Sequence, residues 1–319
     1  MSVLQNKIDF AVVLRVKHAN PNGDPLNGNR PRTDYNGFGE ITDVCLKRKI
    51  RDRLQEAGFA IFVQSDDRKT DGAKHLKERA ESEEWGLGKQ AFQFRLPKTG
   101  KKAAVGIKEP EENTDLINSA KHKTVAAACL KWMDVRTFGN LFAWAKANDA
   151  DSVSVAIRGP VTVQSAFSVN RVEVTSTQIT KSVSGDSKKT KNAASTESEQ
   201  SAGVEGERSS DTMGMKHRID QGTYVFYGSM NPQLAERTGF SGEDAEAIKQ
   251  VLPKLFENDA SSARPEGSME ILKVIWWKHN SKAGQYSSAK VHRTLKVKAD
   301  GEIGLDELEG LVPEVIDGF

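Results

Sequence analysis

The chain contains few cysteines, and it has no long apolar run. Its two cysteines, Cys45 and Cys129, lie far apart among 319 residues, so they provide neither a disulfide framework nor a zinc site. No apolar run approaches the roughly 20 residues of a membrane helix. The first residues lack the charged start and apolar stretch of a secretion signal. These absences exclude a disulfide scaffold and a helical membrane protein, and we expect a cytoplasmic protein.

Motifs of nucleotide-binding and metal enzymes are also missing from the sequence. Residues 86–90, GLGKQ, end like a phosphate-binding loop, but Gln90 replaces Ser or Thr and Glu83 replaces the first glycine. The six histidines have no spacing typical of metal ligands. The sequence therefore predicts no metal and no other cofactor.

Charge is distributed unevenly along a composition that is 37% hydrophobic and 28% charged. The last 21 residues, 299–319, contain seven Asp or Glu and no Lys or Arg, so this acidic tail carries −7. Residues 1–298 therefore carry +9 within the total of +2. A basic body is compatible with a polyanionic partner, although many soluble proteins have a similar imbalance.

The first sixty residues predict a strand, a shaped loop and a basic helix. Residues 8–17 are mostly apolar and predict a strand, and 18–41 are so rich in Asn, Gly and Pro that successive turns are expected. Thr42 is a predicted helix start and Gly58 a predicted stop. Five basic residues within 47–53 favour phosphate contacts, and the alternative is a solvated face whose long side chains cover the edge of the core.

The remaining sequence alternates between strand-like segments and insertions. Residues 60–125 read as a charged, weakly helical insertion without a second core, and 181–210 are too polar to bury one and predict a mobile loop. The other segments give strands near 153–164, 169–180, 223–227 and 271–277, with a helix capped by Ser241. Without the insertions the order is strand, helix, strand, strand, helix, strand, which is the ferredoxin-like arrangement of RNA-recognition modules.

Several motifs in this order resemble a known family. They are NPNGDP at 20–25, PR at 31–32, TDVCLKRKIR at 42–51, DVRTFG at 134–139, RGPV at 158–161, TMGMKH at 212–217, TGFS at 238–241 and SSAR at 261–264. Together they resemble the CRISPR backbone proteins of the Cas-seven family, type I-C (Csd-two). The resemblance implies an α+β fold with an RRM-like (ferredoxin-like) palm, a helical fingers insertion and a β-hairpin thumb. We expect the palm at 1–59, 126–164 and 223–298, the fingers at 60–125, the thumb at 165–222 and the acidic tail at 299–319.

The resemblance also implies a function in antiviral defence without catalysis. Members of the family bind a CRISPR guide RNA as a head-to-tail homo-oligomer within the surveillance complex called Cascade, and they present the guide for pairing with target DNA. Their implied protein partners are capping (Cas-five type), large and small subunits. A subunit that accepts any guide sequence should contact the RNA backbone and leave the base edges free.

We expect the RNA contacts in the loop, the basic helix and the thumb. The predicted RNA-binding residues are Asn22, Arg30, Arg32, Lys47, Lys49, Arg51, Arg53, Arg136, Arg158, Gln164, Ser165 and Arg171. The predicted thumb residues, which would kink the RNA, are Met213, Met215, Lys216 and His217. Methionines suit wedging into a base stack, and ordinary hairpin packing is the alternative. Met215 and residues 221–224 depart from the family pattern, which leaves the thumb contacts open.

Two other functions remain open at this point. Asp24, Asp34 and Asp43 could converge and hold a metal for RNA cleavage, as in type III relatives, although carboxylates in Asx-rich loops more often bond turns. Arg136 could pair with Asp134 instead of RNA. A generic RNA-binding monomer that forms no filament is the third possibility.

Overall fold

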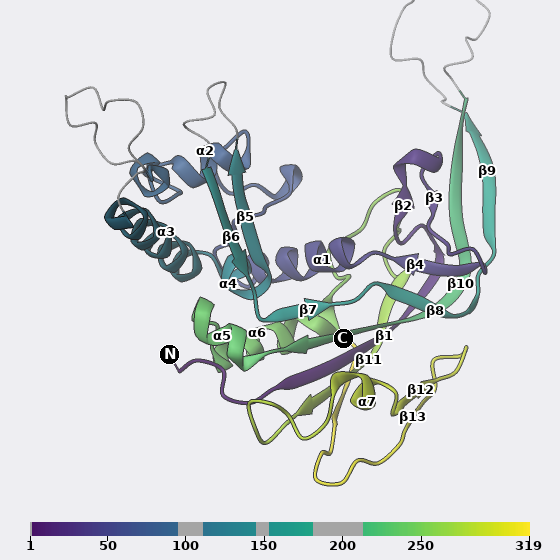
Figure 1. Cartoon of the computed structure of the whole chain (residues 1–319). Helices are drawn as coiled ribbons and strands as arrows, with labels where there is room; N and C mark the ends of the chain where they lie inside the picture. The colour runs from purple at the N-terminus through teal and green to yellow at the C-terminus, as the bar shows by residue number, and fades with distance from the viewer. Residues whose placement is uncertain (1, 95–110, 145–152, 181–212) are drawn as a thin grey trace, which may run out of the picture.

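The computed structural model describes residues 2–94, 111–144, 153–180 and 213–319 (Figure 1). Its centre is an antiparallel sheet in which β1 (Ile8–Ala19) lies between β10 (Met213–Met230) and β11 (Met269–Lys278). The strand order is β14-β11-β1-β10-β8-β4, and β7 (Val161–Val163) and β9 (Val174–Thr180) also pair with β10. The predicted strand at 8–17 is thus confirmed as the middle of the sheet.

One face of the sheet is covered by helices. Phe10, Val12 and Leu14 alternate along β1 and belong to the main core, together with residues of α1 (Asp43–Glu56) and α6 (Gly242–Val251). α5 (Pro232–Thr238) adds to this layer, and Figure 1 shows the helices on one side of the strands. Each fully buried Leu or Phe side chain contributes roughly 1.5–3 kcal/mol. The core therefore fixes the position of α1 beside the sheet.

The helix starts follow the predicted caps. The Thr42 hydroxyl accepts a hydrogen bond from the Cys45 amide at 3.4 Å, so α1 begins as predicted, and it ends at Glu56, two residues before Gly58. Ser241 and Asp244 form a reciprocal capping box at the start of α6. Such caps satisfy amide groups that have no partner within the helix.

The opposite face of the sheet is covered by the end of the chain. Ala11, Val13 and Trp277 pack against α7 (Ser288–His292), against Leu295 of β12 (Leu295–Val297) and against Leu311. β13 (Ile303–Leu305) pairs with β12, and β14 (Glu314–Asp317) pairs with β11 at the sheet edge. The acidic tail is therefore part of the fold. Its few apolar residues supply strand and layer contacts, while its acidic side chains stay at the surface and pair with lysines, as Glu314 does with Lys249 at 2.6 Å.

The segment expected to form the fingers has a core of its own, which the sequence did not predict and which we call the fingers core. Phe62, Phe92, Trp132 and Phe142 pack with ring centroids 4.7–6.3 Å apart. The elements around this core are α2 (Leu76–Glu81), α3 (Glu111–Lys131), α4 (Met133–Phe138) and the hairpin of β5 (Gly139–Trp144) and β6 (Val153–Arg158). The strand at 153–157 was expected in the palm, and its side chains Val155 and Ile157 pack in this second core. The second core therefore contains residues from both sides of the expected boundary at 125 and 126.

The segment expected to form the thumb contains a long hairpin that extends from the sheet. The first half of β10 pairs with β9, and its second half pairs with β1. β8 (Ala166–Arg171) pairs with β10 and with β4 (Phe38–Ile41), and β2 (Gly23–Asp24) pairs with β3 (Arg30–Pro31) in the loop nearby. The predicted mobile loop at 181–210 lies outside the described residues. Among the helices that the structure describes, none is both long and apolar enough to cross a membrane.

Candidate nucleic-acid interface

The loop before α1 folds into a compact hairpin that encloses a small polar cavity. The Asp24 carboxylate accepts a hydrogen bond from the Leu26 amide at 3.2 Å and so closes the first turn. The Asn29 side chain packs closely over Gly23, where a Cβ atom would lie 2.0 Å from Oδ1 of Asn29. The cavity has a volume of about 150 Å³, and its lining residues are Asp24, Asn27, Arg30, Pro31, Arg32, Thr33, Glu40 and Val174.

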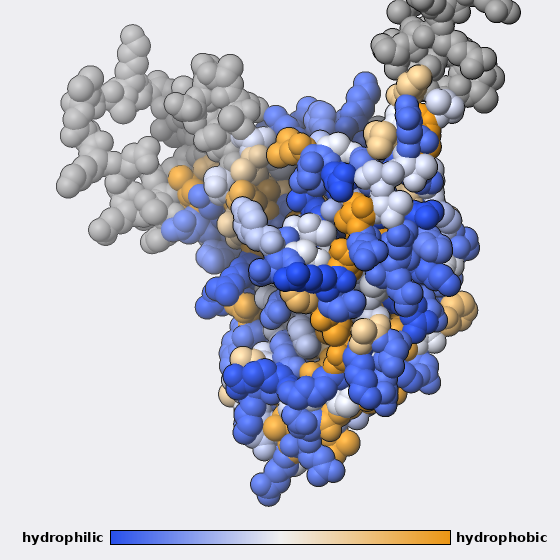
Figure 2. Space-filling view, turned by 90° about the vertical axis from the view of Figure 1, so that its right-hand side faces the viewer, coloured by the Kyte–Doolittle hydropathy of each residue, from blue (hydrophilic) through white to orange (hydrophobic). Residues whose placement is uncertain are grey.

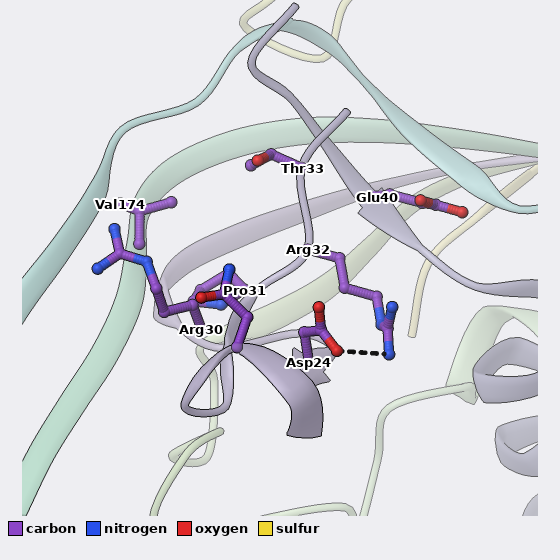
Figure 3. Close-up of a pocket in the computed structure, with 8 residues that line it drawn as sticks. Asp24, Arg30, Pro31, Arg32, Thr33, Glu40 and Val174 are labelled. Carbon is purple, nitrogen blue, oxygen red and sulfur yellow. Dashed lines mark ion pairs between the residues drawn. The ribbon is translucent and has the colours of Figure 1, made fainter. Parts of the chain in front are cut away.

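Two arginines leave this hairpin in opposite directions, as Figure 3 shows. The Arg32 guanidinium extends to Asp24, with Nη2 3.3 Å from Oδ1, and its buried Nε has no hydrogen-bond partner in the described structure. The Arg30 guanidinium extends toward β9 and donates a hydrogen bond from Nη1 to the Ser176 hydroxyl at 3.0 Å. Arg30 therefore connects the loop to the thumb. Ser176 was not among the predicted residues, because nothing in the sequence relates it to a position 146 residues earlier.

Beyond the contact with Arg30, one face of the thumb hairpin carries two methionines. Met213, Met215 and His217 lie opposite Thr180, Gln178 and Ser176 in the β10–β9 register, and directly opposed residues share a face of a sheet. The His217 Nδ1 atom lies 2.8 Å from the Ser176 hydroxyl that Arg30 also contacts. Met213 and Met215 are 61% and 55% exposed. We call this surface, formed by Arg30, Ser176, His217, Met215 and Met213, the thumb strip.

Lys216 lies on the other face of the same hairpin. It alternates with Met215 and His217 along β10, and it shares its face with Arg218. Figure 2 faces the side of the molecule that carries the thumb and shows mostly hydrophilic residues with hydrophobic ones between them. The structure thus brings three of the four predicted thumb residues together and separates the fourth.

The basic residues of α1 form ion pairs with carboxylates of the same chain. Lys49 and Arg53 are only 7% and 5% exposed. Lys49 pairs with Asp259, and Arg53 pairs with Glu56 at 2.8 Å and donates to the Glu257 carbonyl. The positions of Lys49 and Arg53 do not support the expected phosphate contacts, because both side chains fasten the helix to residues 257–259.

Lys47 and Arg51 lie nearer the surface of the same helix. Lys47 pairs with Asp43 at 2.8 Å, and both side chains are partly exposed. Arg51 donates from Nε to Asp134 at 3.0 Å, and its guanidinium lies 5.0 Å from the centre of the Phe138 ring. Exposed pairs such as Lys47–Asp43 contribute only about 0–1 kcal/mol and exchange readily for another anion.

Arg136 pairs with the carboxylate of Asp244 and not with Asp134, the partner that the sequence left open. It forms two hydrogen bonds to Asp244, from Nε at 3.0 Å and from Nη2 at 2.7 Å. Asp134 instead accepts hydrogen bonds from the amides of Phe62 and Val63 and from Arg51. Arg136 therefore connects α4 to the capping box of α6, and its position does not support the expected RNA contact.

Of the other predicted residues, two contact the start of α1 and three are exposed. The Asn22 side chain accepts hydrogen bonds from the amide and the hydroxyl of Thr42, at 3.0 and 2.9 Å, and the Ser165 hydroxyl accepts one from the Asp43 amide at 3.3 Å. Three further predicted residues have exposed side chains, and these are Arg158, Gln164 and Arg171. Asn22 and Ser165 therefore order the helix start, and Arg171 lies at the end of β8 beside the loop.

The loop aspartates bond turns in this structure. Asp24 is paired with Arg32, and the Asp34 carboxylate accepts hydrogen bonds from the amides of Asn36 and Phe38 at 2.9 and 2.8 Å. Within the described parts of the chain, no group of three or more His, Cys, Asp or Glu side chains is placed to hold a metal ion. In this structure Asp24 and Asp34 therefore stabilise the turns of the loop.

The chain is similar to CRISPR-associated proteins over most of its length. The family model described as CRISPR-associated protein Cas7 matches residues 6–309. A protein of Haloferax volcanii named CRISPR-associated protein Cas7 is 26% identical over 324 residues, which cover 98% of this chain and 81% of that protein. Two solved chains of assemblies titled CRISPR RNA-guided surveillance complex, one of them pre-nicking, align at 15% and 16% identity with TM-scores of 0.45 and 0.42. They cover 93% and 85% of this chain, and 77% and 78% of theirs.

Proposed function

Because the chain belongs to the family of CRISPR-associated protein Cas7, we propose that it is a guide-RNA-binding backbone subunit of a Cascade effector complex of type I-C. The match of the family model to residues 6–309 is the observation that carries this proposal, since it includes the palm, the fingers and the thumb. The motifs at 20–25, 42–51 and 212–217 support the type I-C assignment.

The sheet topology supports an RRM-like palm with a different binding surface from a free RNA-recognition module. The order β11-β1-β10-β8 is antiparallel throughout, as in a ferredoxin-like fold. RNA-recognition modules stack bases on an open sheet face, but here one face is covered by helices and the other by α7 and residues 295–311. The proposed RNA site is therefore the loop and the thumb strip, together with Arg32 and Arg171.

The proposed mechanism is backbone binding with periodic distortion. Arg30, Arg32 and Arg171 are flexible cations that bind phosphates irrespective of sequence. Met213 and Met215 are soft, exposed side chains at the end of the strip, and they would enter the base stack and kink the strand. The bases between successive kinks stay free to pair with target DNA. The subunit itself is non-catalytic, and copies of it oligomerise head to tail alongside capping, large and small subunits.

The test uses the purified chain and two labelled guide RNAs with unrelated spacers. We expect similar affinities for both RNAs, a steep loss of affinity with salt, and a large particle in size-exclusion chromatography only when RNA is present. Added Mg²⁺ should leave the RNA intact. Cleavage that depends on Mg²⁺ would favour the ribonuclease alternative with Asp24 or Asp34. Binding without any change in particle size would favour an RNA-binding monomer.

A further inference from the structure

Tyr35 is the most exposed large hydrophobic side chain in the described chain, at 109% of its reference area. Its ring therefore contributes no packing to either core. A single exposed apolar residue needs no explanation by itself, but the backbone that carries this ring is unusually well fixed.

A network of hydrogen bonds holds the turn below the ring. The Asp34 carboxylate accepts from the amides of Asn36 and Phe38, and the Asp34 carbonyl accepts from the amide of Gly37 at 3.1 Å. Gly37 has a φ of +84°, a conformation that other residues rarely adopt. Its carbonyl accepts a hydrogen bond from the Val172 amide at 3.0 Å, which ties the turn to the corner between β8 and β9. The ring is thus presented from an ordered support.

The aliphatic part of the Arg171 side chain lies beside this turn. The Cγ atom of Arg171 lies 3.8 Å from the position that a Cβ atom on Gly37 would occupy, and Arg171 pairs with Phe38 in the sheet register. One turn thus carries an exposed aromatic ring and contacts an arginine side chain. Single-stranded nucleic acid is recognised by aromatic rings and cations together, since a base stacks on the ring and its phosphate contacts the cation. An ordered support lowers the entropy lost on binding.

We propose that Tyr35 is a stacking platform for one unpaired base of the bound RNA and that Arg171 binds the adjacent phosphate. This inference rests on the proposed function. It adds a base contact that does not depend on sequence, because every base has a stacking face. A surface of a second protein chain is the competing occupant, and the test below separates the two.

The test compares three variants by fluorescence anisotropy with a labelled guide RNA at fixed salt. Tyr35→Ala should weaken binding about tenfold, in the range measured for base–aromatic stacking, and Tyr35→Phe should stay within about twofold of the wild type. Leu130→Ala is the matched control, since Leu130 is 85% exposed on α3, outside the proposed RNA site, and has no ring; it should bind like the wild type. Full exposure of Tyr35 predicts an unchanged melting temperature for its variants.

An RNA of the same length with abasic sites identifies the origin of the loss. The wild type and Tyr35→Ala should bind this RNA equally, because it offers no base to stack. Tyr35→Ala should also keep the salt slope of the wild type, whereas Arg171→Ala should lower the slope by about one. Equal binding of the normal RNA by Tyr35→Ala and the wild type would overturn the proposal, and so would an equal loss on both RNAs. A changed particle size with unchanged RNA affinity would assign Tyr35 to a protein contact instead. Failure of the wild type to bind any RNA would overturn the proposed function itself.

Discussion

At the residue scale, the role of a charged side chain depends on partners that are distant in the sequence. Lys49 and Arg53 carry the same charge as Arg30, and the sequence assigned the same role to all three. In the structure, the ammonium group of Lys49 pairs with the carboxylate of Asp259, which lies 210 residues later in the chain. Arg30 instead contacts a hydroxyl on the thumb hairpin. Sequence composition predicts that a helix is basic, but it does not predict which of its charges are already neutralised.

The two kinds of arginine should respond differently to substitution. Arg30→Ala should weaken guide RNA binding about equally for unrelated spacers and lower the salt slope by about one unit on a log–log plot, because one phosphate contact is lost. Arg53→Ala should lower the melting temperature, because it removes a nearly buried partner of Glu56 and of the Glu257 carbonyl. Binding titrations between 50 and 200 mM salt, with thermal melts of each variant, give both quantities. An unchanged slope for Arg30→Ala would contradict its assignment to a phosphate.

A buried cluster around Asp9 should make stability depend on pH. Asp9 lies 2.9 Å from Lys7 Nζ, 2.9 Å from His279 Nε2 and 3.8 Å from His292 Nε2. Burial lowers the pKa of His292 below its usual value of 6.5, although the Asp9 charge acts in the opposite direction. Burial raises the pKa of Asp9, but hydrogen bonds from His279, Ser288 and Lys7 outweigh it and leave the pKa below its usual 3.8.

The sign follows from proton binding in the unfolded chain. Unfolded His292 takes up a proton near pH 6.5 and folded His292 only at lower pH, so stability falls as the pH decreases below about 6.5. The corresponding loss from Asp9 begins only below about pH 4. We expect a lower melting temperature at pH 5 than at pH 7, and a smaller difference in His292→Phe. Equal pH dependence in the variant and the wild type would show that another group is responsible.

At the element scale, the sequence predicted helix caps correctly, but it did not predict strand pairing between distant segments. Thr42 and Ser241 were predicted as helix caps and both are confirmed, because a cap is decided within four residues. The acidic tail was predicted as an appendix, since strand β14 has only four residues and no strand pattern of its own. The position of β14 depends on its pairing with the edge of β11, about forty residues earlier in the chain.

Alternation along β14 gives a test of this assignment. Ile316 packs against the main core, whereas its neighbour Val315 is 44% exposed on the other side of the strand. Ile316→Asp should therefore reduce the free energy of unfolding by about 2 kcal/mol or more, because it places a charge against the core. Val315→Asp is the matched control and should change it by less than about 0.5 kcal/mol. Urea titrations of both variants provide the measurement, and equal losses would mean that the tail does not pair with β11.

At the scale of the whole molecule, one buried carboxylate helps to join two cores. The main core and the fingers core share no buried residue, and Asp134 lies between them with 1% exposure. It accepts hydrogen bonds from the Phe62 and Val63 amides of the fingers and from Arg51 of α1. The motif around Asp134 is visible in the sequence, but the second core is not. Its residues Phe62, Phe92 and Phe142 are spread over eighty residues without a common period.

Removal of this carboxylate should loosen the fingers from the palm. Asp134→Ala leaves two buried amides and one half-buried guanidinium without their acceptor, and we expect a loss of about 3 kcal/mol or more. Calorimetry should show an earlier, broader transition, because the fingers core can then melt before the sheet. Asp134→Asn retains one acceptor oxygen and should lie between this variant and the wild type. A single sharp transition at the wild-type temperature in Asp134→Ala would contradict the coupling.

The pairing of β1 has a consequence for synthesis on the ribosome. Residues 8–19 are made well before their two neighbours in the sheet, which are residues 213–230 and 269–278. At roughly 5–20 residues per second, this apolar strand waits on the order of ten seconds or more for either neighbour. During that interval it offers unpaired edges to any other nascent chain. Truncated products that stop before residue 213 should therefore aggregate or occupy chaperones, and expression should depend on completing translation quickly.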